Sequence, residues 1–378
     1  MPPRRYHRAV DHRARLARTA LCAGLWPAIA QVAIQRLPRR HPILDGDNPV
    51  SHFLQRLDDP RPLLYDGGFG SELFARQIEL TNSTLANESH PEAVVDIHAE
   101  YIAAGADCIG INTFVASELH LAMADKDPTQ AGALARRGAE LAQRARELGE
   151  RDVFIAGSIG PSPGAIEADA GSTDFGIAND KVRAAHQRII DALYEGGVDF
   201  FSIETQFSAV EATMVCDIAR QTGLPIAVNL ALKYTQDRKS KQVVYRTDWG
   251  HSIADLLDIL ASGQYSGGDN LLDHVHLVGI NCGAETRRSE HTGMPYALHG
   301  VEQFKAAMQE RGLDKKLMTY PNAGMPQLNS ALRTIYSQSP EEMAAYIPGL
   351  AASGVQIIGG CCGTTPNHIR AFRRALDP

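Results

Sequence analysis

Two adjacent cysteines, Cys361 and Cys362, lie in the glycine-rich segment GGCCGTTP at residues 359–366. Neighbouring cysteines rarely form a disulfide with each other, because the bond needs a larger Cα separation than adjacent residues comfortably allow. Six cysteines in 378 residues are also too few for a disulfide-stabilised scaffold. The flanking glycines allow the backbone to bend so that both side chains face one point. The pair indicates either a metal site or small buried thiols, and the choice depends on which other side chains reach it.

Eight short apolar runs follow one another from residue 60 onward, separated by stretches with helical spacing such as residues 91–107 and 339–354. The runs cover residues 63–67, 108–114, 153–160, 200–206, 225–232, 276–283, 316–324 and 356–363. They are nearly continuous in apolar residues, as is typical of strands buried on both faces. Eight strand–helix units predict an α/β protein with one (β/α)8 TIM barrel over residues 51–378. A doubly wound open sheet is the alternative, but no G-x-G-x-x-G loop follows the first run.

Polar residues and cysteines gather where the predicted strands end, which is where barrels of this class place their active sites. These residues are Asp66, Asn112, Thr113, Ser158, Glu204, Thr205, Asn281, Cys282, Asn322, Cys361 and Cys362. Closure of the barrel brings the sixth and eighth strands close, with one strand between them, so that Cys282 could reach the cysteine pair. Three thiolates at one point favour zinc, which prefers soft sulfur ligands in tetrahedral geometry.

The other thiols lead to different expectations. Cys108 and Cys216 lie inside apolar elements and are expected to be small buried side chains. A disulfide from Cys282 to one member of the pair is an alternative to zinc, which a reducing compartment disfavours. We expect such a compartment, the cytoplasm, because the few cysteines do not form a disulfide framework.

Charge separates the first 50 residues from the rest of the chain. Residues 1–50 contain nine Arg, no Lys and three Asp, a net charge of +6. Because the whole chain has a net charge of −7, the remainder has a net charge of −13. Arg18 and Pro27 interrupt the apolar segment at residues 16–37, which is too short and broken to span a membrane and lacks the features of a signal peptide. We expect residues 1–50 to be a poorly ordered extension and the protein to bind neither membranes nor nucleic acid.

Eight segments, in this order, resemble the zinc-dependent homocysteine S-methyltransferase family. They are YDGGFGSEL (65–73), ESHPEAVVDIHAEYIAAGAD (88–107), INTF (111–114), GSIGP (157–161), IETQ (203–206), GINC (279–282), YPNAG (320–324) and GGCCGTTP (359–366). The combination of GINC with a later GGCCGTTP is the most specific part. The resemblance implies a (β/α)8 barrel and the transfer of a methyl group to the thiol of homocysteine, giving methionine.

The resemblance also implies roles for individual residues. Cys282, Cys361 and Cys362 would hold Zn²⁺, with the zinc-bound thiolate of the substrate as nucleophile. Glu204 would bind the substrate ammonium, and Asp66 and Gly67 would help to hold the amino-acid end. Asn281 and Ser158 would support them. A buried structural ion pair is the alternative for Glu204, and a turn cap is the alternative for Asp66.

The methyl donor is not fixed by these motifs. Family members that use betaine hold its quaternary ammonium with aromatic rings, but residues 75–89 contain none and Val115 follows Phe114. We therefore expect a small sulfonium donor, S-methylmethionine or S-adenosylmethionine, or a corrinoid protein in trans, since the chain ends soon after residue 366. The basic segment at residues 233–252 is either a lid, a docking site or a solvated loop.

Two other functions stay open. The enzyme would in one case methylate another thiol or a selenol. In the other case the barrel would bind zinc without catalysis, against which Glu204 argues, because a pure metal holder needs no ammonium site.

Overall fold

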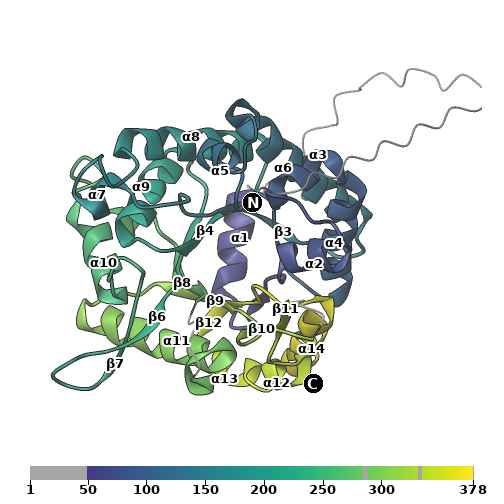
Figure 1. Cartoon of the computed structure of the whole chain (residues 1–378). Coiled ribbons are helices and arrows are strands. Elements are labelled where there is room, and N and C mark those ends of the chain that lie inside the picture. The colour runs from purple at the N-terminus through teal and green to yellow at the C-terminus, as the bar shows by residue number, and fades with distance from the viewer. Residues whose placement is uncertain (1–48, 284–287, 331–333, 378) are drawn as a thin grey trace, which may run out of the picture. The chain divides into compact units, whose positions relative to one another are not determined.

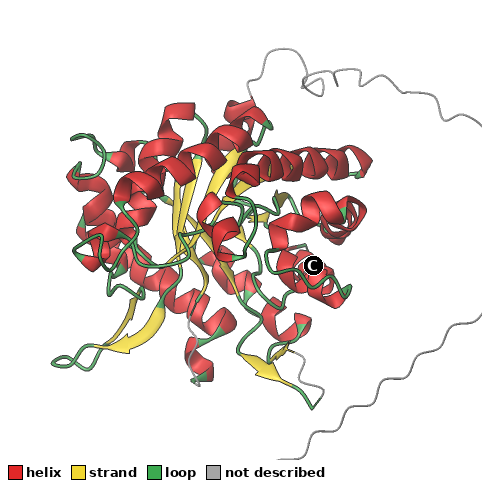
Figure 2. Cartoon of the chain, turned by 45° about the horizontal axis from the view of Figure 1, so that its top comes forward, coloured by secondary structure: helices red, strands yellow, loops and turns green. Residues whose placement is uncertain are grey.

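Eight parallel strands form one closed sheet (Figures 1 and 2) in a computed structural model that describes residues 49–283, 288–330 and 334–377. The strands are β1 (Leu63–Leu64), β2 (Cys108–Gly110), β3 (Phe154–Ile159), β4 (Phe200–Gln206), β5 (Ile226–Leu230), β8 (Leu277–Cys282), β9 (Lys316–Pro321) and β12 (Val355–Ile358). Their order is β1-β12-β9-β8-β5-β4-β3-β2. A parallel bridge between Tyr65 and Cys108 joins the two outer strands. The predicted (β/α)8 barrel is confirmed, and each predicted run overlaps one of these strands.

Helices surround the sheet, as Figure 2 shows. They are α1 (Pro49–Asp58), α2 (Phe69–Ala75), α3 (Ala86–Ser89), α4 (Pro91–Ala104), α5 (Glu118–Met123), α6 (Ala131–Leu148), α7 (Glu167–Ala170), α8 (Asn179–Glu195), α9 (Ala209–Ala219), α10 (Ile253–Ser262), α11 (Gly293–Glu310), α12 (Pro340–Ala344), α13 (Ile347–Ala352) and α14 (Pro366–Leu376). Two hairpins, β6 (Lys233–Gln236) with β7 (Val243–Arg246) and β10 (Pro326–Leu328) with β11 (Thr334–Tyr336), extend the loops after β5 and β9. None of the described helices is both long enough and apolar enough to cross a membrane.

Two helices show how local sequence sets the element ends. α4 begins at Pro91 and ends before Gly105, which adopts a left-handed conformation with φ of 107° that suits glycine. Ser339 and Glu342 form a capping box before α12, as their spacing predicts. The stretch with helical spacing at residues 339–354 forms two helices rather than one, because Pro348 occupies the first turn of α13 and lacks the N–H that a continuous helix would need.

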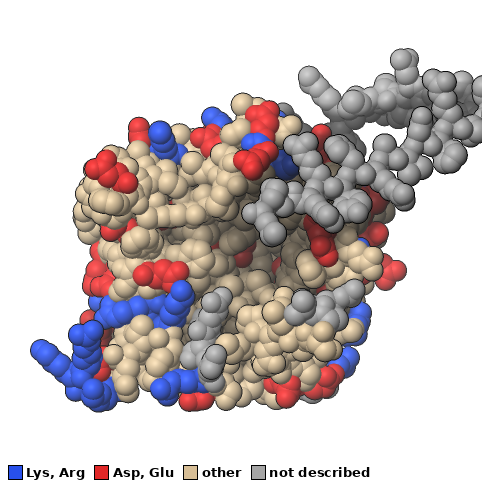
Figure 3. Space-filling view, in the orientation of Figure 1, with Lys and Arg blue, Asp and Glu red and all other residues tan. Residues whose placement is uncertain are grey.

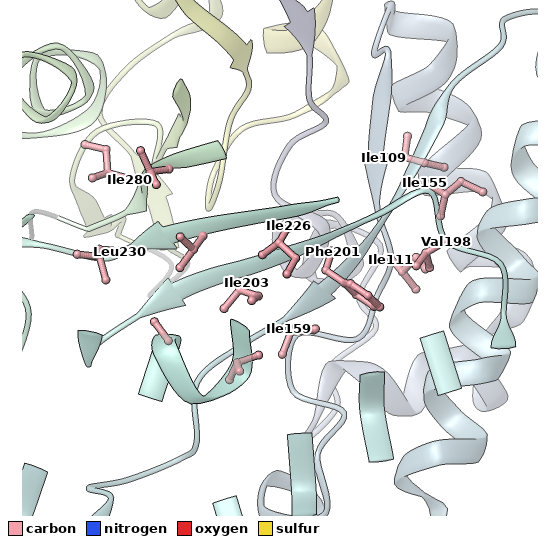
Figure 4. Packing of buried hydrophobic residues seen from close by; sticks show 14 of the residues in the cluster. Ile109, Ile111, Ile155, Ile159, Val198, Phe201, Ile203, Ile226, Leu230 and Ile280 are labelled. Carbon is pink, nitrogen blue, oxygen red and sulfur yellow. The ribbon is translucent and has the colours of Figure 1, made fainter. Parts of the chain in front are cut away.

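The outward side chains of the strands pack against the helices. Ile109, Ile155, Phe201, Ile203 and Ile280 belong to this layer and are buried (Figure 4). The alternate strand positions point into the barrel. Their side chains form a second buried hydrophobic cluster inside it. Because side chains alternate along a strand, each short run supplies both layers.

Helix α1 closes the amino end of the barrel, inside the ring of strands in Figure 1. Phe53 stacks on Phe200 with ring centroids 4.4 Å apart and meets the edge of Phe154 at 5.1 Å. Pro49 and Val50, the last residues of the predicted extension 1–50, begin this helix, and the rest of the extension lies outside the described residues. We propose that the chain preceding α1 is dispensable for folding, whereas α1 is part of the barrel.

Substitution of Phe53 by Ala should lower the free energy of unfolding by about 3–5 kcal/mol, because it empties a buried aromatic site that the surrounding strands cannot refill. The matched change Gln55→Ala, on the exposed face of α1, should alter it by less than about 0.5 kcal/mol. Denaturant unfolding of both variants measures these changes in the free energy of unfolding. The same measurement on a chain lacking residues 1–48 tests whether the segment before α1 is dispensable for folding. A Phe53→Ala variant as stable as the wild type would show that α1 does not support the barrel.

His98, on α4, provides a pH-dependent prediction. Its ring lies 4.8 Å from that of Phe69, neither of its nitrogens has a hydrogen-bond partner among the described residues, and burial lowers its pKa to about 3. The unfolded chain, with an ordinary histidine pKa, therefore takes up a proton first as the pH falls below about 6.5. Folding stability should be lost from that point down to about pH 3, amounting to roughly 2 kcal/mol at pH 5 from this group.

Unfolding curves at pH 7 and pH 5 check this for the wild type and for His98→Leu, with His274→Leu at an exposed position as the control. The His98 variant should lose less stability between the two pH values than either the wild type or the control. An equal loss in all three proteins would contradict the assignment of acid sensitivity to His98.

Candidate active site

Three cysteine thiols meet at the carboxyl end of the barrel. Cys282 is the last residue of β8, and Cys361 and Cys362 follow β12. Their sulfur atoms all lie within 4.8 Å of one another, and all three residues are partly buried. The structure thus brings together the three cysteines that the strand-end argument grouped. Cys108 and Cys216 are completely enclosed in apolar surroundings, as predicted for small buried side chains.

Backbone hydrogen bonds hold the Cys361–Cys362 turn in place. The Cys361 N–H donates to the carbonyl of Pro321 at 2.8 Å, and the Cys362 N–H donates to Oδ1 of Asn322 at 3.1 Å. Gly363 then turns the chain with φ of 79°, and a Cβ there would lie 2.1 Å from the ring of Tyr336. Asn322, one of the polar residues at the predicted strand ends, therefore supports the cysteine turn.

The donor set matches a soft divalent cation. Hydrogen bonds from Cys282 and Cys361 hold the pKa of Cys362 well below its usual range, whereas the bonds that Cys361 makes to the other two thiols raise its own pKa. Three sulfur atoms within 4.8 Å of one another are the kind of donor set that zinc prefers. The residues therefore fit zinc.

Glu204 lies near the end of β4 at the same end of the barrel. The Ser158 hydroxyl, from β3, donates a hydrogen bond to its Oε1. Burial raises the pKa of Glu204 to about 7, although the bonds from Ser158 and Tyr320 act in the opposite direction. Among the described residues, no Lys, Arg or His acts on this carboxyl group as a charge partner. This disfavours a structural ion pair, and an ammonium group beside Glu204 would stabilise its charged form.

Asp66 and Gly67 form the loop after β1 and contact the cysteine turn. Asp66 is only 3 % exposed, and its Oδ2 accepts a hydrogen bond from the Gly110 N–H at 2.8 Å. Burial raises its pKa well above the usual range, and the nearby Glu204 adds to this. Its carbonyl accepts from Gly360 at 3.0 Å. A Cβ at Gly67 would lie 2.7 Å from the hydroxyls of Tyr101 and Thr364, so only glycine allows this close packing.

Two side chains near Glu204, Ser202 and Tyr320, were not predicted from the sequence. Tyr320 of β9 is buried in the barrel, where its hydroxyl lies 3.0 Å from that of Ser202 on β4 and bonds Glu204. Its position is two residues after the inward Met318, so strand alternation could have identified it. Asn281 is where the strand-end rule predicted it, but its amide bonds Thr205, a pairing that no sequence pattern indicated.

The basic segment at residues 233–252 is mostly a hairpin rather than an irregular loop. Strands β6 and β7 pair antiparallel, and the exposed turn between them carries Arg238, Lys239 and Lys241. Figure 3 shows positive side chains gathered at the lower left of the molecule, where Figure 1 places this hairpin. The base of the hairpin is anchored by the buried Tyr245, whose hydroxyl lies 2.8 Å from Nδ1 of His291.

A model of the homocysteine S-methyltransferase family matches residues 63–376, which include the three cysteines, Glu204 and the loop after β1. The chain belongs to this family. The resemblance drawn from eight short motifs is thereby confirmed, and with it the class of enzyme.

Proteins similar in sequence and structure to this chain include named methyltransferases. The chain is 28% identical over 349 residues to homocysteine S-methyltransferase of Escherichia coli, covering 87% of this chain and 99% of the relative. It is also 28% identical over 336 residues to methionine synthase of Mycobacterium tuberculosis, covering 84% of this chain but 25% of that protein. The metallated form of the homocysteine methyltransferase MmuM from Escherichia coli matches with a TM-score of 0.60 and 26% identity over 86% of this chain and 99% of MmuM.

Proposed function

We propose that this enzyme transfers a methyl group to the thiol of homocysteine, giving methionine, and that Cys282, Cys361 and Cys362 hold Zn²⁺ for this reaction. One observation carries the proposal: the three thiols lie at the same end of the barrel as the carboxyl group of Glu204. This carboxyl group has no positively charged partner among the described residues. Homocysteine has the matching groups, a thiol at one end and an ammonium at the other. The metallated structure of a family member supports a metal at the cysteines.

The chain's own residues position the substrate. Glu204 binds the ammonium, and the hydroxyls of Ser158 and Tyr320 hold its carboxylate in place. The buried loop at Asp66 and Gly67 packs against the cysteine turn and lines the amino-acid end. When bound, zinc would supply a Lewis acid that favours loss of the proton from the substrate thiol. In the transfer, the bond from the methyl carbon to the donor breaks as the carbon–sulfur bond forms, and the thiol proton goes to solvent.

The donor proposed here is a small sulfonium compound, S-methylmethionine or S-adenosylmethionine, or else a corrinoid protein acting in trans. Residues 75–89 offer no aromatic side chain for a quaternary ammonium, which disfavours betaine. We further propose that the enzyme works in the cytoplasm, where reducing conditions keep the three thiols free.

Purified, zinc-loaded enzyme with homocysteine and a panel of donors tests the proposal, with methionine measured by mass spectrometry. We expect methionine from at least one sulfonium donor or from a methylated corrinoid protein, and none from betaine. Parallel reactions with other thiols and with selenols test the alternative acceptors. Zinc-loaded protein that methylates none of these acceptors with any donor would instead support a barrel that binds zinc without catalysis.

A further inference from the structure

Asn281 bridges the ends of two strands that are not neighbours. Its Oδ1 accepts the backbone N–H of Thr205 at 2.7 Å, and its Nδ2 donates to the Thr205 hydroxyl, also at 2.7 Å. Asn281 belongs to β8 and Thr205 to β4, while β5 lies between them in the sheet. Asn281 is fully buried and Thr205 is 6 % exposed, so water does not compete effectively for these two hydrogen bonds.

Both ends of this bridge have unusual backbone geometry. Thr205 has φ of 55°, and Cys282, directly after Asn281, has φ of 50°. A positive φ is costly for any residue except glycine and especially for a β-branched one, so the surroundings must hold it. The pairing of β4 with β5 also shifts between Ile203 and Gln206, which places an extra residue in β4 at this point. Bulges of this kind occur frequently beside active sites.

The bridge joins the neighbours of the two groups that would bind the substrate. Glu204 immediately precedes Thr205, and Cys282 immediately follows Asn281. A primary amide suits this task because it offers an acceptor and a donor side by side, and Thr205 presents a matching N–H and hydroxyl oxygen. Thus two hydrogen bonds and two residues with positive φ connect the backbone beside Glu204 to the backbone beside Cys282.

We propose that Asn281 and Thr205 are positioning residues that set the span between Glu204 and the cysteine cluster to the length of homocysteine. This inference rests on the proposed function, because it assigns the ammonium to Glu204 and the thiol to the cluster. Cysteine has the same functional groups as homocysteine but is one methylene shorter, so that it cannot reach both positions equally well. The bridge would therefore determine selectivity by chain length, rather than binding the substrate itself.

The experiment uses the full chain loaded with Co²⁺, whose visible absorption changes when a further sulfur ligand binds. Titration with homocysteine and with cysteine gives two dissociation constants, and their ratio measures selectivity. In Thr205→Val, which keeps the shape but removes the hydroxyl acceptor, we expect the preference for homocysteine to fall about tenfold. Thr205→Ser keeps that acceptor and should retain the preference within about twofold. The cobalt affinity of both variants should stay within about threefold of the wild type.

Asn281→Ala should lower the preference at least as much as Thr205→Val. Its control is Asn87→Ala, which also removes a buried amide, one that donates two hydrogen bonds and accepts one, and which should leave the preference unchanged. If Asn281→Ala fails to fold, the pair of Thr205 variants still decides. A preference retained in Thr205→Val, or equal losses for homocysteine and cysteine, would overturn the inference. Failure of the proposed function would be seen separately, as no homocysteine binding at the cobalt of the wild type.

Discussion

Substitution of Cys282, Cys361 or Cys362 by Ala is expected to lower the zinc affinity by about a hundredfold or more. The sulfur atoms of these residues lie within 4.8 Å of one another, and zinc sites depend on each deprotonated sulfur ligand. Even the loss of a group that only orients a ligand commonly costs ten- to a hundredfold in affinity, so that loss of a ligand should cost at least as much. Metal analysis after purification under reducing conditions, followed by chelator competition, measures the effect.

The buried cysteines provide the control. Cys108→Ala and Cys216→Ala change thiols that are enclosed in the apolar core and are not part of the three-thiol group, so each should keep about one zinc per chain. Their expected effect is on stability, through loss of packing. Wild-type zinc content in all three cluster variants would contradict the assignment of the metal site.

The barrel could be predicted because each of its strands is buried on both faces. Such strands appear in the sequence as short apolar runs, and only the lengths were misjudged: β1 spans two residues, Leu63–Leu64, where residues 63–67 were expected. Helix α1 was missed, because Phe53 and Leu57 fill the barrel from a single helical face and lie ahead of the first predicted apolar run at residues 63–67. The hairpins after β5 and β9 were missed too, because their residues are largely exposed and lack the apolar pattern.

The site could be predicted in part, since the carboxyl ends of parallel strands meet at one end of a barrel. That rule grouped Glu204, Cys282 and the cysteine pair. It could not identify the Asn281–Thr205 bridge, because the bridge depends on the register of β4 and on a positive φ at Thr205. Neither feature has a marker in the sequence, where a glycine would have been the usual indication of such a turn.

Substitution of Glu204 by Gln should raise the KM for homocysteine roughly ten- to a hundredfold. The change keeps the shape of the side chain and its capacity for hydrogen bonding, but removes the charge that would pair with the substrate ammonium. A hydrogen bond to a charged group is worth about 1.5–3 kcal/mol, which corresponds to that range of affinity. Zinc content should be unchanged, since the proposed ligands lie on β8 and after β12 whereas Glu204 lies on β4.

Steady-state rates with homocysteine and with a simple thiol that lacks the amine separate this role from others. The simple thiol cannot use Glu204, so the wild type and the Glu204→Gln variant should methylate it at nearly equal rates, while homocysteine loses its advantage in the variant. Burial opposes the charged form of the Glu204 carboxyl group. The same exclusion of water strengthens its attraction to a bound ammonium group. Equal losses with both thiols would mean that Glu204 supports the barrel or the metal, and that the ammonium binds elsewhere.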